Sequence, residues 1–199
     1  MKSIKDTVSY SWTVKKSTFL CHLIPCDQSS DIKSIIEHYT TKYEDATHNC
    51  IAYIVSSHQK AFDDGEPSGT AGLPMLDVLQ KQEMNNIIAI VTRYFGGIKL
   101  GAGGLARAYR QSVANALQEA TIIEKQLFSV YDITIPYSYT KKFEYILQSQ
   151  QIYCRNKQYD SAITYTCYIA DASFFTTVQE LTRGSYHKLF IEEAFHEIQ

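Results

Sequence analysis

Residues 63–109 read DDGEPSGTAGLPMLDVLQKQEMNNIIAIVTRYFGGIKLGAGGLARAY, and this stretch decides the fold of the first half of the chain. It holds eight of the nine glycines, since only Gly184 lies elsewhere. Glycine is concentrated where the backbone needs a positive φ or where other atoms approach it closely. The charges of the stretch fall into two groups. The acidic loop comprises Asp63, Asp64 and Glu66, and the basic group comprises Arg93, Lys99, Arg107 and Arg110. We therefore expect a structured surface here and not a linker.

A strand and a helix enclose the glycines of the basic half. Residues 87–91 are continuously apolar, which is typical of a buried strand. Residues 105–117 place apolar side chains on one helical face, with Arg107 and Arg110 on the other. The order is therefore strand, glycine-rich loop, helix.

The glycine-rich loop predicts an anion site. Gly101, Gly103 and Gly104 would leave backbone N–H groups open at the helix N-terminus, where an anion is favoured. Lys99 and Arg107 could add positive charge. The loop is not a Walker A motif, because no Gly-Lys-Ser/Thr follows, and GAGGLA matches a dinucleotide fingerprint only locally. The alternative is that the glycines only make tight turns and allow close packing of the helix on the strand.

The acidic loop admits three interpretations. Asp63, Asp64 and Glu66 could hold a divalent cation, although their spacing is not that of an EF-hand. They could form a solvated loop with an Asp-Gly turn, or they could pair with the basic group and hold the two segments together. His48 and Cys50 share one face of a predicted strand, which permits a Cys–His nucleophile. A cysteine in a strand is more often a small buried hydrophobe.

The rest of the sequence predicts a second domain. In the first domain, further strands are expected at residues 17–24 and 50–55, and helices begin at Ser30 as N-cap and near Pro74. After residue 122, strands are expected at residues 127–135, 152–159, 162–169 and 188–195, with a helix after the first and another before the last. This β-α-β-β-α-β order is that of the ferredoxin-like split unit. We predict an α+β fold with domains at residues 1–122 and 123–199.

Composition points to a globular protein of the cytoplasm. The formal net charge of −2 gives no overall footprint of nucleic-acid binding. No apolar run approaches the roughly 20 residues of a membrane span. The N-terminus, MKSIKDTVSYSW, lacks the apolar core of a signal peptide. Five cysteines, an odd number, fit a reducing compartment with free thiols, and Cys154 and Cys167 are interpreted as ordinary strand residues.

Four motifs in this chain resemble the YigZ/IMPACT family. They are KSTFL, DATHNCIAY, DDGEPSGTAGLP and VTRYFGGIKLGAGGLARAY, which together cover about residues 15–115. Thr18 stands where the family often has arginine, which removes one basic contact. The resemblance implies a first domain with the fold of the second domain of ribosomal protein S5, and a second domain like the last domain of elongation factor G. Eukaryotic members regulate translation, whereas the family implies no settled activity for bacterial members, and a fold does not fix a function.

These observations predict a non-enzymatic protein that binds RNA or the ribosome and modulates translation. Four basic residues and no acidic residue lie between Glu83 and Glu119. The phosphate contacts are assigned to Arg93, Lys99, Arg107 and Arg110. No cofactor is expected, apart from the option of a divalent cation in the acidic loop.

Two other classes of function stay open. The first is an enzyme that acts on a phosphorylated or anionic small molecule between the acidic loop and the glycine-rich segment. It would use Asp63, Asp64 or Glu66 as general base or metal ligand, and His48 as an acid–base group. The second is a module that docks a protein partner on the sheet of the second domain.

Overall fold

The computed structural model describes residues 1–198, which divide into two units. Unit 1 comprises Met1–Lys125 with Glu197 and Ile198, and unit 2 comprises Gln126–His196. The division falls close to the boundary expected from the sequence. Ile198 groups with unit 1 because its N–H donates to the carbonyl of Glu124 at 3.0 Å. None of the helices in the described residues is both long and apolar enough to cross a membrane.

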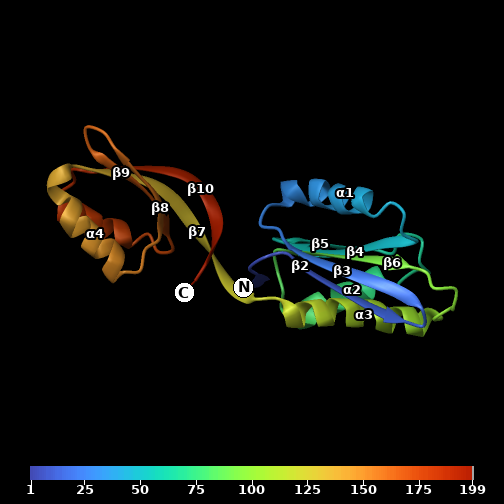
Figure 1. The fold of residues 1–199 in the computed structure, drawn as a ribbon. Coiled ribbons are helices and arrows are strands. Elements are labelled where there is room, and N and C mark those ends of the chain that lie inside the picture. Colours follow the sequence, from blue (N-terminus) through green and yellow to red (C-terminus); the bar gives the residue numbers. More distant parts are fainter. Residues whose placement is uncertain (199) are drawn as a thin grey trace. The chain divides into compact units, whose positions relative to one another are not determined.

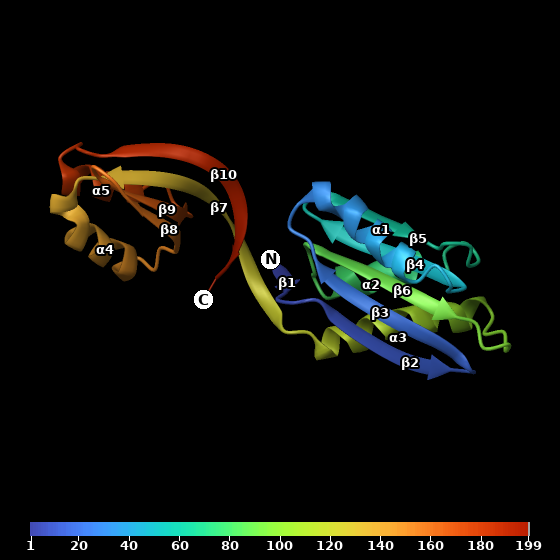
Figure 2. The same cartoon turned by 45° about the horizontal axis from the view of Figure 1, so that its top comes forward.

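Unit 1 is a sheet with helices on both faces (Figure 1). The strands are β1 (Lys2–Ile4), β2 (Val8–Val14), β3 (Ser17–Pro25), β4 (His48–Val55), β5 (His58–Phe62) and β6 (Ile87–Tyr94). The helices are the 3-10 helix η1 (Ser29–Asp31), α1 (Ile32–Lys42), α2 (Gly72–Lys81) and α3 (Ala102–Glu119). The main sheet runs β2-β3-β6-β4-β5 with every neighbouring pair antiparallel (Figure 2). Helix α1 covers one face, and α2 and α3 cover the other.

The central strand β6 shows why this sequence forms a two-sided sheet. Side chains alternate between the faces of a strand. Ile88 and Ile90 pack in the cluster under α1, whereas Ile87, Ala89 and Val91 pack with α2 and α3. All five are fully buried. The prediction of a buried strand at residues 87–91 is confirmed, and the strand continues to Tyr94.

Unit 1 differs from expectation at three places. Strands β2 and β5 extend the sheet beyond the strands that the sequence predicts. The prediction of Ser30 as an N-cap is wrong, because η1 leads directly into α1 and no side chain caps that helix.

Unit 2 has the predicted β-α-β-β-α-β order. Its elements are β7 (Ile122–Ile135, which begins in unit 1), the 3-10 helix η2 (Tyr137–Tyr139), α4 (Thr140–Ser149), β8 (Cys154–Tyr159), β9 (Ile163–Ile169), α5 (Phe174–Thr182) and β10 (His187–Glu197, whose last residue belongs to unit 1). Strand β9 is antiparallel to both β7 and β8, and β10 pairs with the other edge of β7. Insertion of β9 between β7 and β8 is the split arrangement, which confirms the prediction. Residues from α4 and α5 share one core with β7 and β9.

The cysteines do not all remain free thiols, so that prediction is wrong. Cys154 on β8 and Cys167 on β9 are joined by a disulfide. The two residues lie directly opposite one another in the antiparallel pair. Cys21, Cys26 and Cys50 are free and buried.

Candidate functional site

The motifs singled out in the sequence meet at one end of the unit 1 sheet. The acidic loop follows β5, the glycine-rich loop follows β6, and the turn at Lys15 and Lys16 joins β2 to β3 (Figures 1 and 2). The amide N–H of Gly96 donates to Ser17 Oγ at 3.2 Å. A methyl group at Gly96 would overlap the carbonyl of Lys16, so only glycine allows this close approach.

Asp63 organises the acidic loop. Its Oδ1 accepts the amide N–H groups of Ala71 and Gly72 at 3.0 and 2.9 Å, and its Oδ2 accepts that of Gly69 at 2.8 Å. Burial alone would raise the pKa of Asp63, but the three N–H donors outweigh it and lower the pKa below its usual value. The carboxylate thus stays charged and satisfies the start of α2, whose first residue is Gly72.

Asp64 joins the acidic loop to the start of β4. Its Oδ2 accepts the amide N–H of Asn49 at 2.6 Å, and its carbonyl lies 2.7 Å from His48 Nδ1. A carbonyl only accepts, so Nδ1 carries a proton. His48 Nε2 then lies 3.8 Å from Glu66 Oε2, and the His48 side chain is 19% exposed.

Glu66 is the centre of a buried ion-pair network, which we define as Glu66, Arg93, Tyr109 and Cys50. Glu66 Oε1 accepts from Arg93 Nη1 at 2.6 Å and from the Tyr109 hydroxyl at 2.8 Å. The side chains of Arg93 and Glu66 are only 6% and 3% exposed. The rings of Phe19 and Phe95 lie 5.5 and 5.4 Å from the Arg93 guanidinium carbon. These contacts join the acidic loop to β6 and α3.

The network corrects one predicted role and confirms one interpretation. Arg93 was assigned to phosphate contacts, but its charge is buried and already paired with Glu66. Of the three interpretations of the acidic loop, pairing with the basic group is therefore confirmed for Glu66.

Cys50 lies inside the network as a neutral thiol. Its sulfur is 2.9 Å from the Asp63 carbonyl and 3.3 Å from the Tyr109 hydroxyl. Burial raises the pKa of Cys50 to about 12, although the hydrogen bond with Tyr109 acts in the opposite direction. Burial, and next the neighbouring Cys50, also raise the pKa of Tyr109. The reactive form of cysteine is the thiolate, so these contacts disfavour Cys50 as a nucleophile.

The three carboxylates of the acidic loop serve separate partners. Asp63 binds backbone amides of its own loop, Asp64 binds the start of β4, and Glu66 binds Arg93. Within residues 1–198, no group of three or more His, Cys, Asp or Glu side chains is placed to hold a metal ion.

Four exposed basic residues form a second feature at this end of unit 1. We call Lys15, Lys16, Lys99 and Arg107 the glycine-loop basic surface; all four are exposed. Lys15 and Arg107 line one groove of ≈ 460 Å³ together with Trp12 and Leu100. Lys16 lies against the glycine-rich loop through its contact with Gly96.

The start of α3 opens beside this surface. Gly101 is the N-cap, with a φ of 72°, and no side chain caps the helix. Gly101 and Gly103 face open space, since a Cβ at either would meet nothing within 4 Å. Gly104 lines the groove. The first amide N–H groups of a helix have no partner within the helix, so these amides add a positive partial charge here.

Arg110 is directed elsewhere. It is exposed, but its Nε lies 3.3 Å from Asp77 Oδ2 on α2. Of the predicted anion-site residues, Gly104 and Arg107 line one groove, Lys99 and Gly101 precede α3, and Gly103 lies in its first turn. Arg93 and Arg110 are instead paired with the carboxylates of Glu66 and Asp77.

Sequence reasoning missed Lys15, Lys16 and Trp12 as members of the site. A signal for them was present. VSYSWTV at residues 8–14 alternates apolar and polar side chains as a strand does, and Lys15 and Lys16 follow it directly before β3. Both lysines have positive φ values, of 45° and 63°, in the resulting hairpin turn.

The fold and these features define a two-unit α+β protein whose glycine-rich end combines a buried ion pair with an exposed basic surface. Residues 15–117 match the family model of the Impact N-terminal domain, and the chain belongs to the IMPACT family. It is 37% identical to the IMPACT family member YvyE of Bacillus subtilis (strain 168), covering 92% of this chain and 87% of YvyE. It is 34% identical to the IMPACT family member YigZ of Escherichia coli (strain K12), covering 90% of this chain and 92% of YigZ.

A solved structure shares the whole architecture. A crystal structure of an hypothetical protein superposes with a TM-score of 0.67 at 31% identity, covering 96% of this chain and 97% of that one. The two-unit α+β fold is thus common to both chains. The likeness of the units to ribosomal protein S5 and elongation factor G stays a prediction.

Proposed function

We propose that this IMPACT-family protein is a cytoplasmic, non-enzymatic protein that binds RNA or the ribosome through the glycine-loop basic surface and modulates translation. Phosphate oxygens are bound by Lys and Arg side chains and by backbone N–H groups at helix N-termini. Both kinds of donor lie together at the start of α3.

The observation that carries this proposal is a set of cations without an internal counter-charge. Lys15, Lys16, Lys99 and Arg107 make no ion pair within residues 1–198. An exposed cation with no carboxylate partner is available to a phosphate. A local surface of this kind is compatible with the net charge of −2, because electrostatic attraction within about 10 Å is what counts at ordinary salt.

The contacts of the acidic-loop carboxylates favour binding over catalysis at these residues. A carboxylate that acts as a general base must be free to take a substrate proton. The carboxylates of Asp63, Asp64 and Glu66 are each engaged by protein N–H or O–H donors. They are therefore parts of the scaffold that presents the basic surface.

The test is co-sedimentation with ribosomes across a salt series. The Lys99→Glu/Arg107→Glu variant should lose most of its binding. If two phosphate contacts are lost on single-stranded RNA, the slope of log affinity against log salt should fall by about 1.4. The matched control is Lys33→Glu/Lys42→Glu, which makes the same charge change at exposed positions of α1, on the other face of the sheet.

Two results would contradict the proposal. One is the absence of wild-type binding even at low salt. The other is an equal loss in both double variants, which would show a response to net charge and not to this surface. Fluorescence of Trp12, the one tryptophan of the chain, checks that unit 1 is folded in each variant.

A further inference from the structure

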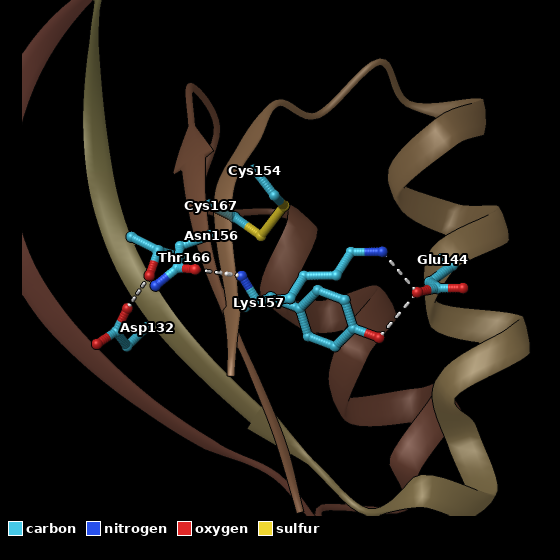
Figure 3. The surroundings of a disulfide bond; sticks show 8 residues. Asp132, Glu144, Cys154, Asn156, Lys157, Thr166 and Cys167 are labelled. Carbon is cyan, nitrogen blue, oxygen red and sulfur yellow. Dashed lines mark hydrogen bonds and ion pairs between the residues drawn. A yellow bond between two sulfur atoms is a disulfide. The ribbon is translucent and has the colours of Figure 1, made fainter. Parts of the chain in front are cut away.

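Cys154 and Cys167 form a pair across the edge of the unit 2 sheet (Figure 3). Strand β8, which carries Cys154, is the edge strand, and every residue from Arg155 to Tyr159 is exposed. Cys154 itself is partly buried, whereas Cys167 is fully buried in the core with Phe143. One sulfur is thus placed near the surface and the other beneath it.

A bulge sets this pairing. Asn156 lies opposite Thr166, and without a shift Cys154 would lie opposite Tyr168. The register shifts between Cys154 and Asn156, so that Arg155 is the extra residue and Cys154 lies opposite Cys167. Because a bulge interrupts the ladder of hydrogen bonds, the covalent link is an important part of what holds the start of β8 to β9.

The other three cysteines are unsuited to exchange. Cys21 and Cys50 are fully buried, and Cys26 is 3% exposed. Burial raises the pKa of all three thiols. Exchange requires an accessible thiolate, so it should be confined to the pair on β8 and β9.

We propose that Cys154 and Cys167 are a reversible thiol–disulfide site that reacts with low-molecular-weight disulfides such as oxidised glutathione, with Cys154 as the entering thiol. In reducing compartments, disulfides are usually transient and serve catalysis or redox sensing. The partly buried Cys154 meets the small disulfide, and the buried Cys167 resolves the mixed disulfide. This inference does not depend on RNA binding.

The reaction is a two-step exchange. The Cys154 thiolate attacks one sulfur of oxidised glutathione, the S–S bond of glutathione breaks, and one glutathione thiolate leaves. The Cys167 sulfur, having lost its proton, then attacks Cys154 Sγ, and the second glutathione thiolate leaves. The cysteine pair is oxidised by two electrons, and oxidised glutathione becomes two thiols that take up the two protons released by the cysteines.

The state of the bond controls the edge of the sheet. In the oxidised form, Arg155 at the bulge contacts Glu192 at 2.8 Å and Tyr168 at 3.5 Å. In the reduced form, β8 is held to β9 by hydrogen bonds and side-chain contacts alone. We expect its backbone amides to exchange with solvent faster in that form.

The experiment uses the full chain, reduced and then incubated with oxidised glutathione, followed by alkylation of the remaining thiols after unfolding and by mass spectrometry. The wild type should pass from five alkylated cysteines to three and retain no glutathione. Cys167→Ser should retain one glutathione, on Cys154. Cys154→Ser should retain none, because Cys167 is buried. Cys26→Ser, the control, should form the disulfide as the wild type does.

Several results would overturn the proposal. The wild type failing to oxidise is one, and Cys154→Ser taking up glutathione as fast as Cys167→Ser is another. If Cys167→Ser does not fold, peptide mapping of the wild type at short times replaces it, and glutathione should be found on Cys154 first. Equal amide exchange of β8 in the oxidised and reduced wild type would refute control of the edge strand.

Discussion

Replacing Glu66 with glutamine removes one charge from the buried ion-pair network but keeps the size of the side chain. The amide oxygen can still accept from Arg93 or Tyr109, so the change isolates the charge. Arg93 is then left as a buried cation without a counter-charge, since its side chain is only 6% exposed and Glu66 Oε1 is 2.6 Å away in the native protein. Such a cation cannot be compensated by water without opening the structure.

The expected loss of stability follows from this burial. Breaking a buried ion pair from one side costs about 3–5 kcal/mol. For a domain with a total stability of about 5–15 kcal/mol, this is a large share. With a urea m-value of about 2 kcal/mol per molar, the unfolding midpoint of unit 1 should fall by about 1.5–2.5 M.

Trp12 fluorescence in a urea titration measures this shift for unit 1 alone. The chain has one tryptophan, and its ring packs 5.9 Å from Phe19 in the unit 1 core. The matched control is Asp77→Asn, which removes a carboxylate from the exposed contacts with Lys81 and Arg110. Exposed pairs contribute little, so this variant should unfold close to the wild type.

A second arm tests the cause of the loss. Glu66→Leu/Arg93→Met removes both charges and should be more stable than Glu66→Gln, because apolar replacement of a buried pair is often neutral. It should also keep ribosome binding, since the glycine-loop basic surface is intact. The reasoning is refuted if Glu66→Gln unfolds at the same urea concentration as Asp77→Asn, or if the double variant is no better than the single one.

Three further predictions use the same structure. Gly96→Ala should destabilise unit 1 by at least about 2 kcal/mol in the urea assay, because the new methyl group overlaps the Lys16 carbonyl. Gly103→Ala is the control and should unfold close to the wild type, because a methyl group there meets open space. Because the folded protein lowers the pKa of Asp63, this carboxylate contributes fully to the free energy of unfolding above the ordinary pKa of 3.8, and the contribution is lost as pH falls through the lower folded value. Asp63→Asn should therefore be less stable near neutral pH and should lose less stability than the wild type on acidification. An equal loss of stability on acidification in both proteins would count against this prediction. Reduction of the Cys154–Cys167 bond should lower the free energy of unfolding of unit 2 by about 3 kcal/mol, because the bond closes a loop with a sequence separation of 13. Far-ultraviolet circular dichroism measures this loss, while the unfolding of unit 1, followed by Trp12 fluorescence, should not change.

Much of the fold could be predicted from apolar patterns, and the exceptions have physical reasons. Strand β6 and the order of unit 2 were readable because apolar runs and helical periods are local signals. Strand β2 carries an equally local signal in its alternation of Val8, Tyr10, Trp12 and Val14, although no strand is predicted there. Strand β5 carried none, since HQKAF is mostly exposed and exists as a strand because it pairs with β4. Pairing of that kind depends on residues distant in sequence.

The disulfide could be predicted only in part from the sequence, because its spacing is a local signal but its geometry depends on how two strands pair. Cys154 and Cys167 lie at equal distances from the midpoint of Asp160 and Ser161, so the simplest hairpin would have placed them opposite one another. The pairs from Asn156 to Tyr159 follow a register that would place Cys154 opposite Tyr168, and the bulge at Arg155 shifts Cys154 back to a position opposite Cys167. The spacing was therefore informative, but only the backbone shows how the pair is made.

The alternation of side chains along β6 explains why Arg93 is buried while Lys99 and Arg107 are exposed. The predicted strand ends at Val91, and the sequence assigns Arg93, together with Lys99, to phosphate contacts. Since the strand runs on to Tyr94, alternation places Arg93 on the same face as Val91, toward α3. An inward-facing arginine needs a buried acid, and the acidic loop supplies Glu66 to it. Lys99 and Arg107 lie beyond the end of that strand, so no sheet position turns them inward and their charges stay at the surface. The residues to test for phosphate binding are consequently those outside the β6 alternation, together with Lys15 and Lys16 of the adjacent turn.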